Sequence, residues 1–108
     1  MMDAEEMKEA VLEACADVED PELQLGLVDL GLIYDVRAED KEGETHVEID
    51  MTLTSPGCPV GPQLMAAVHR KALETEGVDT VHINLVWSPR WDPKVHASED
   101  ARMDMGIF

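Results

Sequence analysis

The sequence predicts a two-layer α+β domain, in which helices cover one face of a three-stranded mixed sheet. Three observations support this fold class. Two strand-like alternating stretches follow one another across a short charged turn, a helix-like stretch comes next, and a third alternating stretch follows it. A short turn joins antiparallel strands, whereas a helical crossover joins parallel strands with right-handed topology, so the sheet should be mixed. The length of 108 residues suits one domain spanning residues 1–108.

The first element is expected to be a helix between Asp3 and Val18. Its apolar residues recur at helical spacing and form one stripe, and acidic residues occupy its first turn, where the helix dipole favours anions. The stretch "EDPEL" then ends the helix, because proline restricts the residue before it and cannot continue the hydrogen-bond ladder. Cys15 lies on the apolar stripe, so we interpret it as a core residue.

Two strands are expected next, over Leu27–Glu39 and Glu44–Thr54, and the charged turn "EDKEGE" joins them as a hairpin. In the second strand, apolar residues occupy the odd positions from Val47 to Leu53, and polar residues occupy the even positions from His46 to Thr54. This alternation predicts one buried and one exposed face. Because such a sheet is small, we expect its free edge or face to find a partner, most simply a second copy of the chain.

The second half of the chain begins with a helix expected over Gly61–Glu76. Pro62 suits its first turn, and Gly77 suits the position after its end. The stretch "DTVHINLVW" then alternates as a third strand. The tail is expected to be irregular until Ser98, which could cap a short C-terminal helix.

The charge balance excludes several classes of partner. The net charge is −16, from 24 acidic and 8 basic residues, so there is no basic patch for nucleic acid or for an anionic membrane surface. The sequence contains no run of about 18 apolar residues, so no membrane span is expected. The N-terminus "MMDAEEMKEA" lacks the features of a secretory signal, so a cytoplasmic protein with two reduced cysteines is expected. The acidity itself fits either a solvated surface, as in a salt-rich cytoplasm, or a docking face for a basic partner.

The stretch "TLTSPGCPVGP", residues 52–62, carries the main candidate for chemistry, Cys58. The unpaired amides and positive dipole end of the following helix favour a thiolate, and three prolines restrict the turn. Hydroxyls that could bond a sulfur or an anion, and carboxylates that could reach the same corner, are those of Thr52, Thr54, Ser55, Asp20, Glu22 and Asp29. The alternative interpretation is that the cysteine fills space at a strand–helix corner and the carboxylates form turns.

A closed metal site is not expected from this chain alone. It contains no CxxC or HxxxH pattern, and the histidines at 46, 69, 82 and 96 are scattered and expected to be solvated. A metal bound at Cys58 would need further ligands from a second subunit, a partner or a small thiol, which would make the site labile. A cysteine-dependent enzyme acting on a thiol or thioester substrate is the competing chemistry, and it would need a base that the sequence does not place near the sulfur.

Five motifs in one order carry a resemblance to a known family. They are "DPEL" at Asp20, "VDLGLIYDV" from Val28, "MTLTSPGCP" from Met51, "VWSPRWDP" from Val86 and "SEDAR" from Ser98. Together they resemble the SufT/PaaD-like metal–sulfur cluster assembly family, whose relatives include the eukaryotic cytosolic iron–sulfur targeting factors. The resemblance covers the chain from about residue 20 to residue 106.

This resemblance implies a fold like the C-terminal domain of NifU-type scaffolds, and a non-enzymatic role in the maturation of iron–sulfur proteins. It implies that Cys58 is the functional thiol and a transient ligand of an iron–sulfur cluster or of iron, with no tightly bound cofactor. It implies apo iron–sulfur proteins and the assembly machinery as partners, while the free edge or face of the small sheet leaves a homodimer as a further option. The supporting positions that it implies are Asp20, Glu22, Asp29, Thr52, Thr54 and Ser55.

The C-terminus distinguishes two branches of that family. The PaaD branch, an accessory to a phenylacetyl-CoA oxygenase, typically carries an added cysteine-rich C-terminal segment. This chain has no cysteine after Cys58. The departure favours the short stand-alone SufT-like branch and leaves the role of an oxygenase accessory subunit as the alternative.

Overall fold

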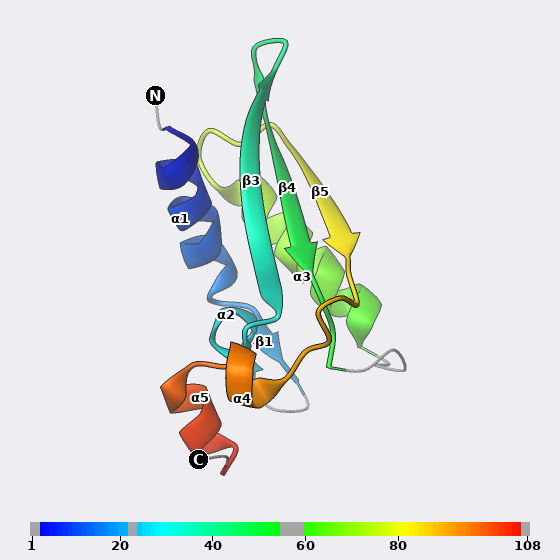
Figure 1. Ribbon diagram of the computed structural model, residues 1–108. Helices are drawn as coiled ribbons and strands as arrows, with labels where there is room; N and C mark the ends of the chain where they lie inside the picture. The colour runs from blue at the N-terminus through cyan, green and yellow to red at the C-terminus, as the bar shows by residue number, and fades with distance from the viewer. Residues whose placement is uncertain (1–2, 22–23, 55–59, 107–108) are drawn as a thin grey trace.

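The computed structural model describes residues 3–21, 24–54 and 60–106 (Figure 1). Within these residues the elements follow one another as α1 (Ala4–Cys15), β1 (Glu19–Asp20), β2 (Leu25–Gly26), α2 (Leu27–Leu30), β3 (Ile33–Lys41), β4 (Glu44–Met51), α3 (Gly61–Glu74), β5 (Thr80–Leu85), α4 (Pro93–His96) and α5 (Glu99–Asp104). None of the helices described is long and apolar enough to cross a membrane.

The main sheet has three strands in the order β3-β4-β5. Strand β4 pairs antiparallel with β3 and parallel with β5, as expected of a hairpin followed by a helical crossover. Helices α1 and α3 pack against each other and against β3 and β5, and Figure 1 shows α3 behind the sheet and α1 beside β3. The predicted α+β class and the mixed three-stranded sheet are confirmed.

The core lies between the two long helices and one face of the sheet. The odd-numbered residues Val47, Ile49 and Met51 of β4 are fully buried there, as their alternation predicted. Cys15 is fully buried in the same cluster, and its thiol lies 3.9 Å from the carbonyl oxygen of Val68. Burial raises the pKa of the Cys15 thiol to about 11, and the prediction that this cysteine is a core residue is confirmed.

The predicted strand over Leu27–Glu39 is wrong in its first third. Residues Leu27–Leu30 form the short helix α2. Leu27 and Leu30 are both buried, and residues three apart share one face in a helix, whereas in a strand they would face opposite sides. Gly31 ends this helix with φ 75° and donates its N–H to the carbonyl of Val28 at 3.1 Å. Strand β3 therefore starts only at Ile33.

The boundaries of the hairpin and of the tail also differ from expectation. Strand β3 continues to Lys41, so that only Glu42 and Gly43, both with positive φ, form the turn within "EDKEGE". The small sheet β1–β2 and helix α4 were not expected, whereas the side chain of Ser98 caps α5 as predicted.

The C-terminal segment is held against α2 and the start of β3. The indole N–H of Trp91 donates to the carbonyl of Leu30 at 2.7 Å, and the Tyr34 hydroxyl donates to the carbonyl of Pro89 at 2.8 Å. The amide of Ser98 donates to the carbonyl of Asp29 at 2.7 Å. These bonds fix the tail across the end of the sheet where β4 finishes (Figure 1).

Candidate functional site

The candidate site is the end of the sheet at which β4 finishes and α3 begins. After Met51 the chain stays tied to its neighbours, because the Thr52 amide donates to Leu32 O at 2.8 Å and the Val86 amide donates to Met51 O at 2.8 Å. It then runs through Thr54 to residues 55–59. Cys58 and Ser55 lie in this stretch, outside the described residues, as does Glu22, so the roles predicted for these three remain predictions.

Helix α3 starts directly after that stretch. Its cap residue Val60 makes no side-chain hydrogen bond to the first turn, and Pro62 occupies that turn. Among the described residues, therefore, the cap residue leaves the amides of the first turn without a side-chain cap, at the positive end of a helix of 14 residues. The predicted position of this helix start is confirmed, whereas the thiolate that it is expected to favour, at Cys58, stays a prediction.

Gly61 anchors this helix start on the core. It is buried, and a Cβ at this position would lie 2.6 Å from Cδ1 of Leu53, which is itself buried at the end of the β4 segment. Glycine at this position leaves room for the Leu53 side chain against the start of the helix. Both flanks of the Cys58 stretch, Leu53 before it and Gly61 after it, are thereby packed against each other.

Thr52 departs from its predicted position. The alternation of β4 placed it on the polar face with His46 and Asp50, yet it is 0% exposed. Strand β4 ends at Met51, three residues before the predicted end at Thr54, and beyond Met51 the bond from the Thr52 amide to Leu32 O holds Thr52 inside the fold. Its Oγ1 is buried and has no hydrogen-bond partner within the described residues. An unpaired buried hydroxyl costs about 1–3 kcal/mol, so it requires a functional or structural reason.

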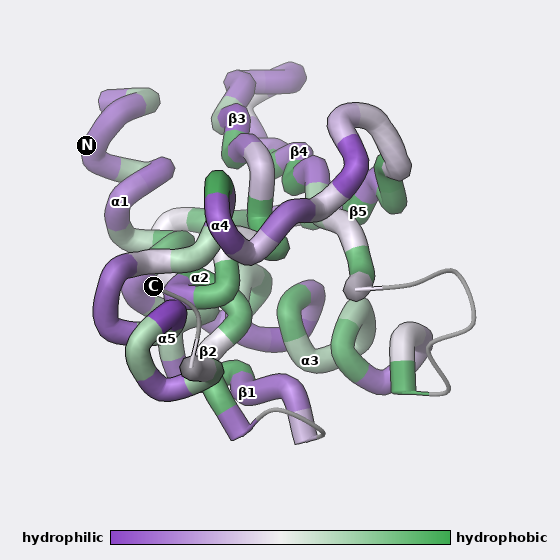
Figure 2. Tube along the Cα trace, turned by 60° about the horizontal axis from the view of Figure 1, so that its bottom comes forward, coloured by the Kyte–Doolittle hydropathy of each residue, from purple (hydrophilic) through white to green (hydrophobic). Residues whose placement is uncertain are grey.

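The two described carboxylates of the predicted site lie on the small elements at the same end of the molecule, onto which Figure 2 looks. Asp20 ends β1 and is 2% exposed, and its main-chain carbonyl accepts a bond from the Gln24 amide at 2.7 Å. Asp29 lies in the first turn of α2 and is exposed, as is Thr54 beyond β4. The structure thus brings α2, β1 and the end of β4 to one end of the domain, with Asp20 and Thr52 inside and Asp29 and Thr54 outside.

The four histidines form no single cluster, although His46 and His82 both lie near Glu48 on the neighbouring strands β4 and β5. His46 on β4 bonds to Thr80 at 2.6 Å and to Glu48, and His96 stacks on Tyr34 with 5.1 Å between ring centroids. His82 on β5 is exposed, whereas His69 on α3 is half-buried. The described residues contain no group of three or more histidine, cysteine or acidic side chains that could hold a metal ion.

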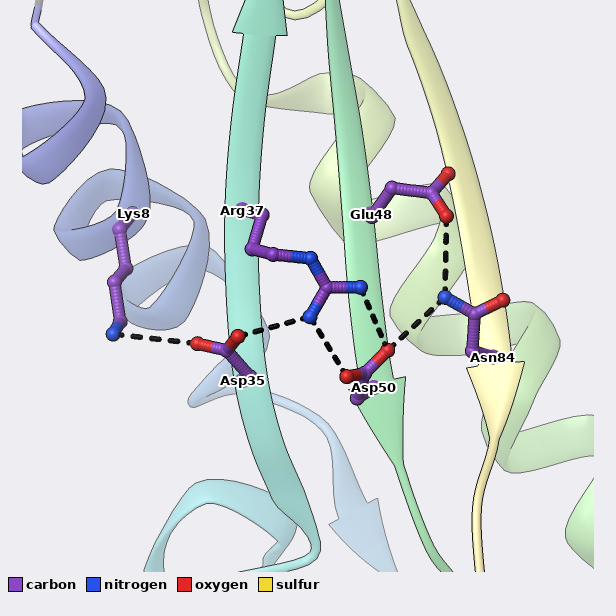
Figure 3. A network of polar contacts seen from close by, with 6 residues as sticks. All are labelled: Lys8, Asp35, Arg37, Glu48, Asp50 and Asn84. Atoms are coloured by element: carbon purple, nitrogen blue, oxygen red, sulfur yellow. Dashed lines mark hydrogen bonds and ion pairs between the residues drawn. The ribbon is translucent and has the colours of Figure 1, made fainter.

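The polar face of the sheet carries a network that the sequence did not predict in detail (Figure 3). Arg37 of β3 makes two hydrogen bonds to Asp50 of β4, at 2.7 and 3.0 Å, and one to Asp35 at 2.9 Å. Lys8 of α1 reaches Asp35 at 3.5 Å. The alternation indicated a polar face, but the cross-strand pairing depends on the register of Arg37 against β4, which sequence alone does not give.

This network sets the charges on the open face. The Arg37 guanidinium holds the pKa of Asp50 and that of Asp35 below their usual range. A hydrogen bond from His46, and a second from Asn84, lower the pKa of Glu48. The carboxylates of Asp35, Glu48 and Asp50 are therefore ionised and already hydrogen-bonded within the sheet. They are consequently not free to act as ligands for a metal ion.

Comparisons with known proteins agree with this architecture. Residues 8–83 match the family described as iron-sulfur cluster assembly protein. The chain is 41% identical over 88 residues to the Fe-S protein maturation auxiliary factor SufT of Staphylococcus aureus, covering 82% of this chain and 96% of that protein. It is 39% identical over 103 residues to the auxiliary factor YitW of Bacillus subtilis, covering 95% and 97%.

A solved structure gives the same fold. A domain of unknown function from Bacillus anthracis superposes with a TM-score of 0.84 at 34% identity, covering 97% of this chain and 96% of that one. The family match runs from within α1 to within β5, which includes both flanks of the Cys58 stretch. The chain therefore belongs to the iron–sulfur cluster assembly protein family, and its relatives include the SufT-type maturation factors.

Proposed function

We propose that this protein is a non-enzymatic factor that helps deliver iron–sulfur clusters, or iron, to apo-proteins. Family membership supports the general role, since relatives matched over more than 90% of their length are named maturation auxiliary factors. The observation that carries the specific role is the uncapped start of α3 immediately after the Cys58 stretch. The amides of its first turn, which the Val60 side chain does not cap, would favour the thiolate form that binds iron.

In the proposed mechanism Cys58 acts as a transient ligand of the cargo. One thiolate cannot complete the coordination of a cluster, so the remaining ligands come from the client, a second copy or a small thiol. The cargo therefore leaves easily when a client offers a full ligand set. Thr52, Thr54 and Ser55 are proposed to donate hydrogen bonds toward the sulfur or the cargo, and Asp20, Glu22 and Asp29 to shape the surrounding corner.

The buried hydroxyl of Thr52 supports this assignment. It lies six residues before Cys58 and lacks a partner among the described residues. A donor kept buried without a partner costs stability, which selection accepts more readily at a functional position. We propose further that residues 1–108 act as one domain, in a reducing cytoplasm, with apo iron–sulfur proteins and the assembly machinery as partners.

The test compares the two cysteines of the chain. Cys58→Ser should abolish maturation of client iron–sulfur enzymes in cells that carry only the variant, while its urea midpoint stays that of the parent protein. Cys15→Ala is the matched control, because Cys15 is buried in the core. It should lose about 1 kcal/mol or more of stability yet keep maturation. Active client enzymes in the Cys58→Ser cells would refute the thiol role.

Thiol labelling tests the same assignment in the purified protein. With its pKa raised to about 11, Cys15 is expected to be about 0.03% thiolate at pH 7.5, and it is also buried. One fast-reacting thiol per chain is therefore expected, and Cys58→Ser should remove it. Fast labelling that survives in Cys58→Ser would show that Cys15 is the accessible thiol and would contradict the proposal.

A further inference from the structure

The two outer strands of the main sheet are protected to different degrees. Helix α1 packs beside β3, and its Lys8 forms an ion pair with Asp35 of that strand at 3.5 Å. Strand β5 pairs with β4 on one side, and within the described residues no strand pairs with its other side. The free edge of the sheet is therefore β5, which is the outermost strand on the side away from α1 in Figure 1.

This edge lacks the features that usually block pairing. Its sequence, "TVHINL", contains no lysine, no proline and no acidic residue. Residues of a parallel strand direct their main-chain groups alternately to the two sides, and the Val86 amide points to β4 through its bond to Met51 O at 2.8 Å. The amides and carbonyls of Val81, Ile83 and Leu85 consequently point outward.

Apolar side chains are exposed along the same edge. Leu85 is 38% exposed and Trp87, two residues further on, is 44% exposed. Leu73 of α3 is 42% exposed. Lys71 lies on the side of α3 that faces α1, because its Nζ is 4.0 Å from the carboxylate of Asp17, just after the end of α1. Leu73, two residues further on, lies about 200° around the helix axis from Lys71. Leu73 therefore lies on the β5 side of α3, and we call Leu73, Val81, Ile83, Leu85 and Trp87 the β5 edge.

The distribution of charge selects the occupant. No acidic residue occurs from Met51 to Leu73 or from Thr80 to Trp91, so all 24 carboxylates of this chain lie outside α3 up to Leu73 and outside β5. Two copies that each carry a net charge of −16 repel one another over most of their surfaces. The β5 edge itself carries no carboxylate, and the carboxylates of Glu48 and Asp50 on the adjacent strand already accept hydrogen bonds from Asn84, so two copies meet less repulsion along this edge. A basic partner, in contrast, would be drawn to the acidic surfaces elsewhere.

We propose that the β5 edge is a homodimer interface, at which β5 of two copies pair antiparallel about a two-fold axis. Centring the pair on Ile83 places Ile83 opposite its own equivalent and Val81 opposite Leu85 of the second copy. The outward main-chain groups then meet in register, and the apolar side chains meet on the helix side of a continuous sheet. The interface is self-complementary, as a two-fold dimer requires.

This inference is independent of the thiol chemistry. Antiparallel pairing places the two α3 N-termini at opposite ends of the paired strands, so the dimer does not need Cys58 and does not share it. Because the contact is small and the copies repel, we expect a reversible dimer that forms at about micromolar to millimolar concentration. Raising the salt concentration screens the repulsion and should favour the dimer.

Sedimentation velocity tests the proposal on the full chain, at about 5–500 μM protein and about 0.05–1 M salt. Leu85→Lys places a charge on the edge, and Val95→Lys is the matched control, since it makes the same charge change at a residue of α4 that is 73% exposed. We expect the parent protein and Val95→Lys to dimerise alike and more strongly in high salt. Leu85→Lys should weaken dimerisation at least tenfold without changing the melting temperature.

Amide hydrogen exchange locates the contact. In the dimer, the amides of Val81, Ile83 and Leu85 should gain protection that rises with protein concentration. Three results would overturn the proposal: a monomer at every concentration and salt tested, a dimer that survives Leu85→Lys, or protection of these amides only on adding a client protein. The last result would assign the edge to a client strand instead.

Discussion

Gly61→Ala tests whether the two flanks of the Cys58 stretch must pack closely. The added Cβ would lie 2.6 Å from Cδ1 of Leu53, whereas ordinary contact begins at 3.4 Å. Leu53 is 6% exposed and belongs to the core, so it has little room to move. Overpacking of this kind costs about 1–3 kcal/mol. Replacing glycine by alanine in a helix gains up to about 1 kcal/mol, and less at its first residue.

The steric cost should therefore exceed the helix gain, with a net loss of about 1 kcal/mol and a fall in melting temperature of about 4–8 °C. Urea unfolding followed by circular dichroism measures the loss. The same substitution in a Leu53→Ala background provides the control, because the atom that the new Cβ meets is then absent. There Gly61→Ala should be neutral or stabilising. An equal effect of Gly61→Ala in both backgrounds would refute the packing argument.

Three further predictions concern other parts of the site and its support. Thr52→Val should stabilise the fold by about 1 kcal/mol, because it removes a buried hydroxyl that has no described partner, and should impair client maturation if that hydroxyl serves the cargo. Arg37→Met should cost about 0.5–1 kcal/mol at pH 7, since the pairs are partly exposed. Because Arg37 lowers the folded-state pKa of Asp35 and Asp50, its contribution is complete above about pH 4 and disappears as the pH falls through the lowered values, so unfolding curves of parent and variant should converge in acid. Trp91→Phe should cost about 1–2 kcal/mol in thermal unfolding, because it leaves the Leu30 carbonyl without the indole N–H.

The sequence predicted the elements whose periodicity is long and clear. Strand β4 and helix α3 were recognised because period 2 and period 3.6 persist in them over 8 and 14 residues. Helix α2 was missed because four residues are barely one turn, and a buried turn of helix has the same apolar composition as a buried strand. The strand β1–β2 pair has two residues a side and leaves no period to detect.

The start of α3 beside the candidate site was predictable from the sequence, but the burial of Thr52 was not. Gly61 and Pro62 in the sequence indicated where α3 begins, which is the feature that supports a thiolate. The burial of Thr52 could not be predicted, because strand alternation assigns it to the polar face. Its actual position depends on the bond to Leu32, a residue 20 positions away in sequence. Tertiary contacts of this kind override local pattern.

The two proposals use the same pair of elements but separate parts of them. The thiol role depends on the first turn of α3, whereas the dimer depends on the outer side of β5 and on Leu73 near the other end of α3. Antiparallel pairing leaves one α3 N-terminus free at each end of the joined strands, so each copy would keep its own delivery site. Leu85→Lys should accordingly leave client maturation intact, and Cys58→Ser should leave the dimer intact. Loss of both properties in either variant would mean that delivery and dimerisation use one surface, and that the β5 edge is part of the delivery site.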